Sequence, residues 1–172
     1  MPDQVLNLST FGEIIENPEK GRSTSPNDLT FQSIKDRRSE KEDKKGSVEG
    51  INHVSLKALQ HTAQLRLLHW QTRSYAEHKA LDEIFDTLTG LTDNLVESIM
   101  GKYGRPNFGG ECSISLNDYK EGCAPGCINE IRNCYIEECK SYFNSGNDGE
   151  IINIIDEILS ALDKADYLLS LK

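Results

Sequence analysis

The chain has 172 residues, of which 37% are hydrophobic and 27% are charged, a balance that is ordinary for one soluble globular domain. Its formal net charge of −9 argues against a free nucleic-acid surface and for a surface that attracts cations. No apolar run is long enough to span a membrane, and no basic flank precedes a long apolar centre at the N-terminus. We therefore expect a cytoplasmic protein with no membrane partner.

Residues 1–50 differ in composition from the rest of the chain. A short apolar patch is followed by the polar tract KGRSTSPNDLTFQSIKDRRSEKEDKKGS, which has too few large apolar side chains to form a core. We predict an extended or disordered N-terminal arm over 1–50 and one domain over 51–172. The arm has eight Lys/Arg and ten Asp/Glu. Interleaved acids would cancel most of the counterion release that drives phosphate binding, so DNA binding is doubtful.

The first half of the domain predicts two antiparallel helices. Residues 51–73 have apolar side chains at helical steps, and we expect these to face the core: Leu56, Leu59, Ala63, Leu67 and Trp70. A short join leads to a second helix over 75–102. Ser74 and Glu77 have the spacing of a capping box, in which the Ser74 hydroxyl accepts from the Glu77 amide and the Glu77 side chain reaches back.

The second half predicts a long connection and two more helices. Within the connection, 103–126, Ser115 and Asp118 could cap a short helix over 116–121. The third helix should run over 127–143, with Ile128, Ile131, Tyr135 and Tyr142 facing inward. After the turn signal NSGNDG, the fourth helix should run over 150–171, with an apolar stripe of Ile151, Ile155, Ile158, Leu162 and Leu169.

Two histidines and three carboxylates have the spacing of a helical metal site: His69, His78, Asp82, Asp93 and Glu97. In the second helix, His78 and Asp82 are four residues apart, as are Asp93 and Glu97, and the eleven-residue step between Asp82 and Asp93 is close to three turns. These four side chains therefore form one stripe. The stripe flanks the apolar face of the helix, where a second subunit could complete a site. The hairpin should bring His69 beside His78.

Other interpretations of these residues are open. A single helical histidine is more often structural than a ligand, and a stripe of acids is usually a solvated face. Asp86 shares the flank and could be a spare ligand, although solvent exposure is the simpler interpretation. We expect His61 to be structural or exposed.

The order His-Trp, His-x3-Asp and Asp-x3-Glu resembles the ferroxidase motif of the Dps-type miniferritins, within the ferritin-like superfamily. The resemblance implies an all-α, ferritin-like four-helix bundle with a short crossover helix. It assigns His69, His78 and Asp82 to one subunit and Asp93 and Glu97 to its two-fold mate, and it places Trp70 beside the iron. The turn between the two histidines is shorter than is usual in the family.

The resemblance also implies a function. Fe(II) would bind at a di-iron or mono-iron site between subunits and be oxidised by peroxide or dioxygen, with the same five ligands as catalytic residues. Ferric iron would then be stored inside a homo-oligomer built from dimers, a dodecamer in this family, which would protect against peroxide.

A different class of function is the alternative. The chain could be a structural or scaffolding protein, for example a minor shell or capsid component located in the virion, whose N-terminal arm binds neighbouring proteins. Five cysteines add to this alternative, since we do not associate them with miniferritins: Cys112, Cys123, Cys127, Cys134 and Cys139. Their spacing is not that of a tetrahedral zinc site, and we expect free thiols. A thiol metal cluster and a disulfide between Cys123 and Cys127 are the other options.

Overall fold

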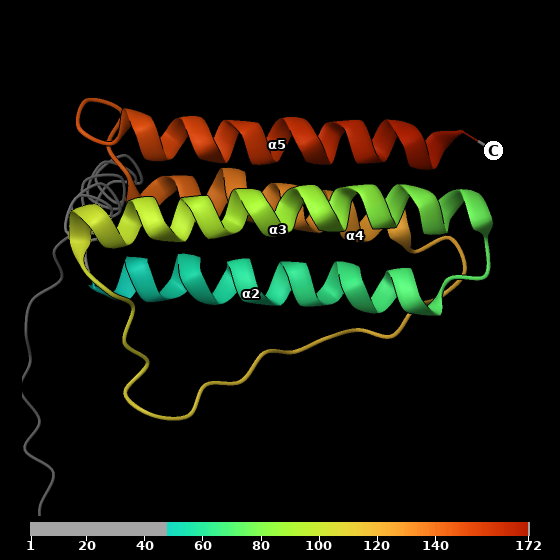
Figure 1. Cartoon of the computed structure of the whole chain (residues 1–172), viewed down its shortest axis with the longest axis horizontal. Helices are drawn as coiled ribbons and strands as arrows, with labels where there is room; N and C mark the ends of the chain where they lie inside the picture. Colours follow the sequence, from blue (N-terminus) through green and yellow to red (C-terminus); the bar gives the residue numbers. More distant parts are fainter. Residues whose placement is uncertain (1–47, 172) are drawn as a thin grey trace, which may run out of the picture. The chain divides into compact units, whose positions relative to one another are not determined.

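The computed structural model describes residues 48–171 of the chain, and this part is all helical. The helices are α2 (Val48–Gln71), α3 (Tyr75–Tyr103), α4 (Ala124–Asn133) and α5 (Gly149–Ser170), labelled as in Figure 1. A π-helical turn, η1 (Cys134–Glu138), and a 3-10 turn, η2 (Cys139–Tyr142), continue α4. The four predicted helices are confirmed. The predicted arm lies outside the described residues, except that 48–50 belong to α2. Among the described helices, none has the length and apolar content to cross a membrane.

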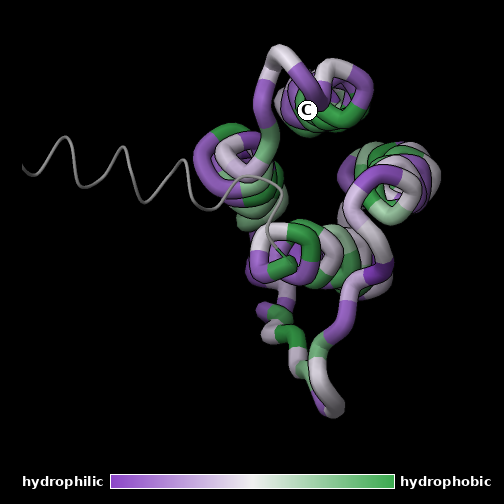
Figure 2. Tube along the Cα trace, turned by 90° about the vertical axis from the view of Figure 1, so that its left-hand side faces the viewer, coloured by the Kyte–Doolittle hydropathy of each residue, from purple (hydrophilic) through white to green (hydrophobic). Residues whose placement is uncertain are grey.

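Successive helices do not simply alternate in direction. α3 packs against both α2 and α5, α4 packs against α5, and η2 contacts α2 (Figures 1 and 2). Residues 104–123 run back along α2, because Asn107 bonds to Asn52 near its start and Tyr119 bonds to Gln71 at its end. α4 is therefore parallel to α3, and α5 returns antiparallel to both. The directions are up, down, down and up, joined by one long crossover.

Helix α3 begins where the sequence predicts. The Ser74 hydroxyl accepts a hydrogen bond from the Glu77 backbone N–H at 3.3 Å. The second half of the predicted capping box is wrong, because the Glu77 carboxylate does not reach back to Ser74. It accepts instead from the Thr72 hydroxyl at 2.5 Å and from the Tyr119 hydroxyl at 2.6 Å, which ties the hairpin to the end of the crossover. Gly104 ends the helix with φ of 92°, a conformation that favours glycine.

The core face predicted for the first helix is wrong. Leu59 is 55% exposed and Trp70 is 67% exposed. The buried face of α2 mixes apolar and polar side chains: Ile51, Val54, Ser55, Ala58, His61, Gln64, Leu65 and Leu68. Because polar residues occupy several of its buried positions, this face shows no clear hydrophobic periodicity in the sequence. The apolar stripe that the sequence displays therefore lies on the outer side of α2.

The predicted short helix over 116–121 is also wrong, because the crossover is extended there. Its backbone bonds to carboxamide side chains along one face of α2: Asn52, Gln60, Gln64 and Gln71. Gln64 donates to the carbonyl of Asn117 at 2.8 Å and accepts from its N–H at 2.7 Å, and Asn52 holds Asn107 in the same way. These carboxamides satisfy backbone groups that a helix would have satisfied internally.

The last two helices begin a little earlier than predicted. α4 starts at Ala124 instead of Cys127, because Pro125 occupies the first turn, where its missing N–H costs nothing. Its predicted inward residues Ile128, Ile131 and Tyr135 are buried, and Tyr142 is half-buried. The predicted stripe of α5 is buried at Ile151, Ile155, Ile158 and Leu162, and Leu169 is half-buried.

Candidate functional site

The α2–α3 hairpin brings three of the five predicted ligands together. His69, in the last turn of α2, stacks on His78, in the first turns of α3, with ring centroids 4.1 Å apart and planes at 27°. The Nε2 atom of His69 lies 3.8 Å from Oδ1 of Asp82, one turn beyond His78. All three side chains are partly exposed. They form a small polar cluster at the end of the hairpin where residues 72–74 join the two helices.

Backbone carbonyls orient both imidazoles. Nδ1 of His69 lies 3.3 Å from the carbonyl oxygen of His78, and Nδ1 of His78 lies 3.2 Å from the carbonyl oxygen of His69. A carbonyl oxygen only accepts, so each Nδ1 carries the proton and donates it. In a neutral ring this leaves the Nε2 lone pair free. Carbonyl partners of this kind fix the tautomer and orientation of metal-binding histidines in proteins.

The carboxylate of Asp82 is ionised in this environment. A hydrogen bond from Nζ of Lys79, at 3.2 Å, lowers the pKa of Asp82, and the positive charge of Lys79 adds to this effect. Nζ of Lys79 binds Oδ2 of Asp82, while Oδ1 of Asp82 lies near Nε2 of His69. Because the Lys79 side chain is 57% exposed, it can move into solvent and free the second oxygen.

The other two predicted ligands lie elsewhere on α3. Asp93 and Glu97 are exposed on the same flank of the helix as Asp82. At 1.5 Å per residue, Asp93 is about 16 Å from Asp82 along the axis, so the two groups cannot share one ion within a chain. Within 48–171, no group of three or more His, Cys, Asp or Glu side chains is placed to hold a metal ion by itself. The chain thus presents two separate sets of ligand-type residues.

Trp70 follows His69 in the sequence and is largely exposed. Its ring lies 5.8 Å from the guanidinium of Arg66, which also stands 3.6 Å over the ring of Phe85. Tryptophan and arginine are both enriched at protein interfaces. The predicted place of Trp70 beside an iron ion stays a prediction.

The displaced apolar stripe of α2 creates a surface that the sequence did not predict. Two hollows, of about 560 and 400 Å³, share Leu59, Thr62 and Thr89 in their linings. We define the α2–α3 apolar face by the large side chains that line them: Leu56, Leu59, Phe85, Val96, Phe108 and Ile114. Asp93 lines the second hollow. One of the predicted ligands therefore borders an exposed apolar surface.

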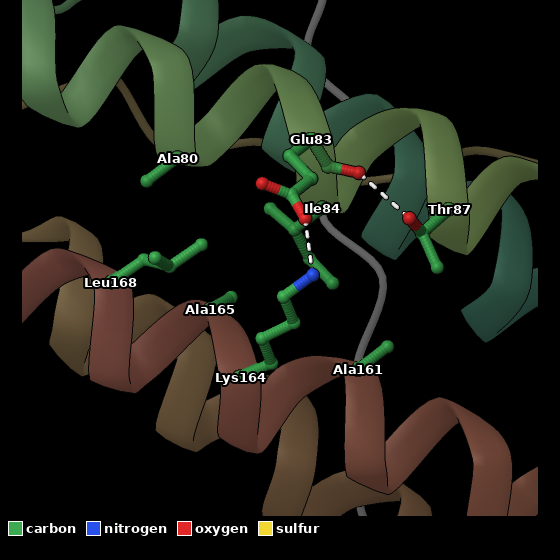
Figure 3. Close-up of a pocket in the computed structure, with 8 residues that line it drawn as sticks. All are labelled: Ala80, Glu83, Ile84, Thr87, Ala161, Lys164, Ala165 and Leu168. Atoms are coloured by element: carbon green, nitrogen blue, oxygen red, sulfur yellow. Dashed lines mark hydrogen bonds and ion pairs between the residues drawn. The ribbon is translucent and has the colours of Figure 1, made fainter.

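A third hollow, between α3 and α5, can be set aside as a ligand site. Figure 3 shows Lys164 of α5 reaching the Glu83 carboxylate of α3, an ion pair of 2.5 Å, among the small side chains of Ala80, Ala161 and Ala165. Its volume of about 80 Å³ is well below the few hundred Å³ of a typical ligand pocket. It is a packing gap between two helices.

Comparison with known proteins identifies a family. A family model described as "Family of unknown function (DUF5856)" matches residues 69–169, which include all five predicted ligands. Neither the curated proteins nor the solved structures contain a match to the chain. The matched region covers more than half of the sequence, and the chain belongs to the DUF5856 family, whose function is unknown.

Proposed function

We propose that this protein is a Dps-like iron-binding protein, which oxidises Fe(II) at a site shared by two subunits and stores the ferric product. The observation that carries the proposal is the cluster of His69, His78 and Asp82. Backbone carbonyls orient two imidazoles whose Nε2 lone pairs are free, and an ionised carboxylate lies beside them. Imidazole suits Fe(II), and carboxylates suit both oxidation states of iron.

The separation of the ligand residues favours a site between subunits. His69, His78 and Asp82 would supply one side, and Asp93 and Glu97 of a second copy would supply the other. The α2–α3 apolar face borders Asp93 and gives the second copy a surface to pack on. In a two-fold dimer, each subunit would contribute to two equivalent sites. The acidic net charge of −9 would raise the local concentration of the cation.

The order of the helices also supports this proposal. Ferritin-like four-helix bundles have one long crossover connection. The described part of the chain has helices that run up, down, down and up, with residues 104–123 as the crossover. The extended crossover differs from the short helix that the resemblance implies.

A scaffolding function is the second candidate. The same exposed apolar face, with Leu59 55% exposed, would also suit a different protein partner. In that case the ligand-type residues would be solvated side chains. The two candidates differ in whether the protein oxidises iron.

Anaerobic Fe(II) titration of the purified full chain, followed by peroxide, separates the candidates. We expect saturable Fe(II) binding and rapid growth of ferric absorbance, with a particle mass close to that of a dodecamer. The His78→Ala, Asp82→Ala double variant should lose both binding and rapid oxidation. Asp86→Ala is the matched control, because Asp86 is exposed one turn further along the same flank. Equal oxidation by the wild type and the double variant would reject the iron proposal and leave the scaffold.

A further inference from the structure

A π-helical turn interrupts the third helical segment. In an α-helix, Cys134 and Cys139 would point about 140° apart around the axis, because they are five residues apart. In η1 the backbone N–H of Cys139 donates to the carbonyl of Cys134, which closes a wider turn and brings both side chains to one face. Cys134 is 8% exposed and Cys139 is fully buried. Such turns are rare and occur frequently at functional sites.

The two thiols belong to a polar cluster inside the helical core. Cys134 lies close enough to Cys139 and to His61 of α2 for both to affect its thiol. The edge of the His61 ring packs on Tyr135, with centroids 5.3 Å apart, and Nδ1 of His61 is buried without a hydrogen-bond partner. The Tyr135 hydroxyl is likewise buried and unsatisfied. The two thiols therefore share the core with a histidine ring and a tyrosine hydroxyl instead of apolar side chains alone.

The environment makes the two thiols unequal. Hydrogen bonds with Cys139 and His61 outweigh burial and lower the pKa of Cys134, whereas the neighbouring Cys134 and burial raise the pKa of Cys139. The thiolate is the nucleophilic form of cysteine. Cys134 therefore has the character of an attacking thiol, and Cys139 that of a thiol that keeps its proton.

One side of the cluster leads to the surface. The Glu138 side chain lies near Cys134, is itself 48% exposed and binds Nε2 of His53 at 2.9 Å. Because Cys134 itself is only 8% exposed, a small molecule can approach it more readily than a bulky reagent.

We propose that Cys134 and Cys139 form a thiol pair that hydrogen peroxide oxidises to a disulfide. The Cys134 thiolate attacks one peroxide oxygen; an S–O bond forms, the O–O bond breaks, and the hydroxide that leaves takes up a proton as water. The Cys139 sulfur then attacks the Cys134 sulfenic acid; the S–S bond forms, the S–O bond breaks, and a second water leaves. Two thiols lose two electrons, and one peroxide is reduced to two waters. The proposal is independent of the iron site.

The test uses the full chain with Cys112→Ser, Cys123→Ser and Cys127→Ser, so that only the pair remains. One equivalent of peroxide is added in the presence of a chelator, and the intact mass is followed. We expect the folded protein to lose the mass of two hydrogen atoms, with a peptide map linking Cys134 to Cys139. This should occur at least about tenfold faster than in the same protein unfolded in urea.

Single variants assign the two roles. Cys139→Ser should gain the mass of one oxygen atom, as a sulfenic acid at Cys134, and Cys134→Ser should react at least about tenfold more slowly. Cys139→Ala repeats the test should the serine disturb the core, and circular dichroism confirms the fold of each variant. Recovery of both thiols after peroxide treatment of the folded chain would overturn the proposal. Equal reactivity of Cys134→Ser and Cys139→Ser would overturn the assignment of roles.

Discussion

At the scale of single residues, the Asp148 side chain links the start of α5 to the end of α3. Its side chain is 2% exposed and binds Nζ of Lys102 at 2.8 Å, the hydroxyl of Tyr103 at 2.5 Å and the backbone N–H of Asn144 at 2.6 Å. We expect Asp148→Ala to lower the free energy of unfolding by about 1–3 kcal/mol, because it leaves these donors without their acceptor. The loss stays moderate because Lys102 keeps Glu150 as a partner.

Urea denaturation of both proteins measures this effect. Glu150→Ala is the control: it removes the other carboxylate bound to Lys102, but its side chain is 60% exposed, so we expect a change within about 1 kcal/mol. Equal stabilities of the wild type and Asp148→Ala would show that the buried carboxylate contributes nothing.

The same carboxylate predicts a dependence on pH. Burial alone would raise the pKa of Asp148, but hydrogen bonds from Asn144, Lys102 and Tyr103 outweigh it and hold the pKa below its ordinary value. A folded-state pKa below the unfolded value of about 3.9 stabilises the fold above that pH, and the contribution disappears as pH falls through the folded pKa. The difference in unfolding free energy between wild type and Asp148→Ala should therefore shrink below about pH 4. A constant difference from pH 7 to pH 3 would contradict this.

At the scale of elements, the crossover depends on α2 for its shape. Gln64 is 7% exposed and makes both hydrogen bonds to the backbone of Asn117. Replacing it by leucine keeps the bulk but removes both bonds, so the crossover should open locally at a cost of about 1 kcal/mol. Hydrogen exchange at the Asn117 amide should become faster. Gln60→Leu is the control, because Gln60 binds only the carbonyl of Ser115; unchanged exchange at Asn117 in Gln64→Leu would refute the role of Gln64.

These contacts explain which elements the sequence could predict. The start of α3 was predictable because Ser74 caps Glu77 only three residues away. The path of the crossover was not predictable, because Gln64 and Asn117 are 53 residues apart in the sequence. A local pattern such as Ser115-x-x-Asp118 cannot show that a distant side chain will bind the backbone of this segment. The core face of α2 was missed for the same reason: Gln64 is buried only because the crossover satisfies it.

The candidate site could also be predicted only in part from the sequence. The lengths of the hairpin helices were enough to predict that His69 lies beside His78. The sequence could not show which ring nitrogen faces a carbonyl, because this depends on side-chain rotation within a folded turn. Nor could it show that Cys134 and Cys139 share a face, since helical periodicity assumes an unbroken α-helix.

At the scale of the whole molecule, the α2–α3 apolar face predicts self-association. Leu59 is 55% exposed at the point where the two hollows meet, so a charge there would be buried without a partner in a dimer. We expect Leu59→Glu to weaken dimerisation at least about tenfold in sedimentation experiments while circular dichroism stays unchanged. Ser160→Glu, on the exposed side of α5, should leave the mass unchanged. Equal masses of the wild type and Leu59→Glu would exclude this face from the contact.

A shared site can be recognised by mixing two inactive proteins. The His78→Ala, Asp82→Ala variant and the Asp93→Ala, Glu97→Ala variant would each lack one side of every site, so neither should oxidise Fe(II) rapidly. After dissociation and random reassociation in equal amounts, half of the dimers would contain one chain of each kind. In a two-fold dimer such a pair has one site with all five ligands intact and one that keeps only His69, so about a quarter of the wild-type oxidation rate should return. A site formed within one chain would give no recovery, because every chain in the mixture is defective. Recovery would therefore mean that Asp93 and Glu97 of one chain act together with His78 and Asp82 of another. The distance along α3 leads to the same requirement, because Asp82 and Asp93 of one chain are about 16 Å apart and cannot bind the same ion.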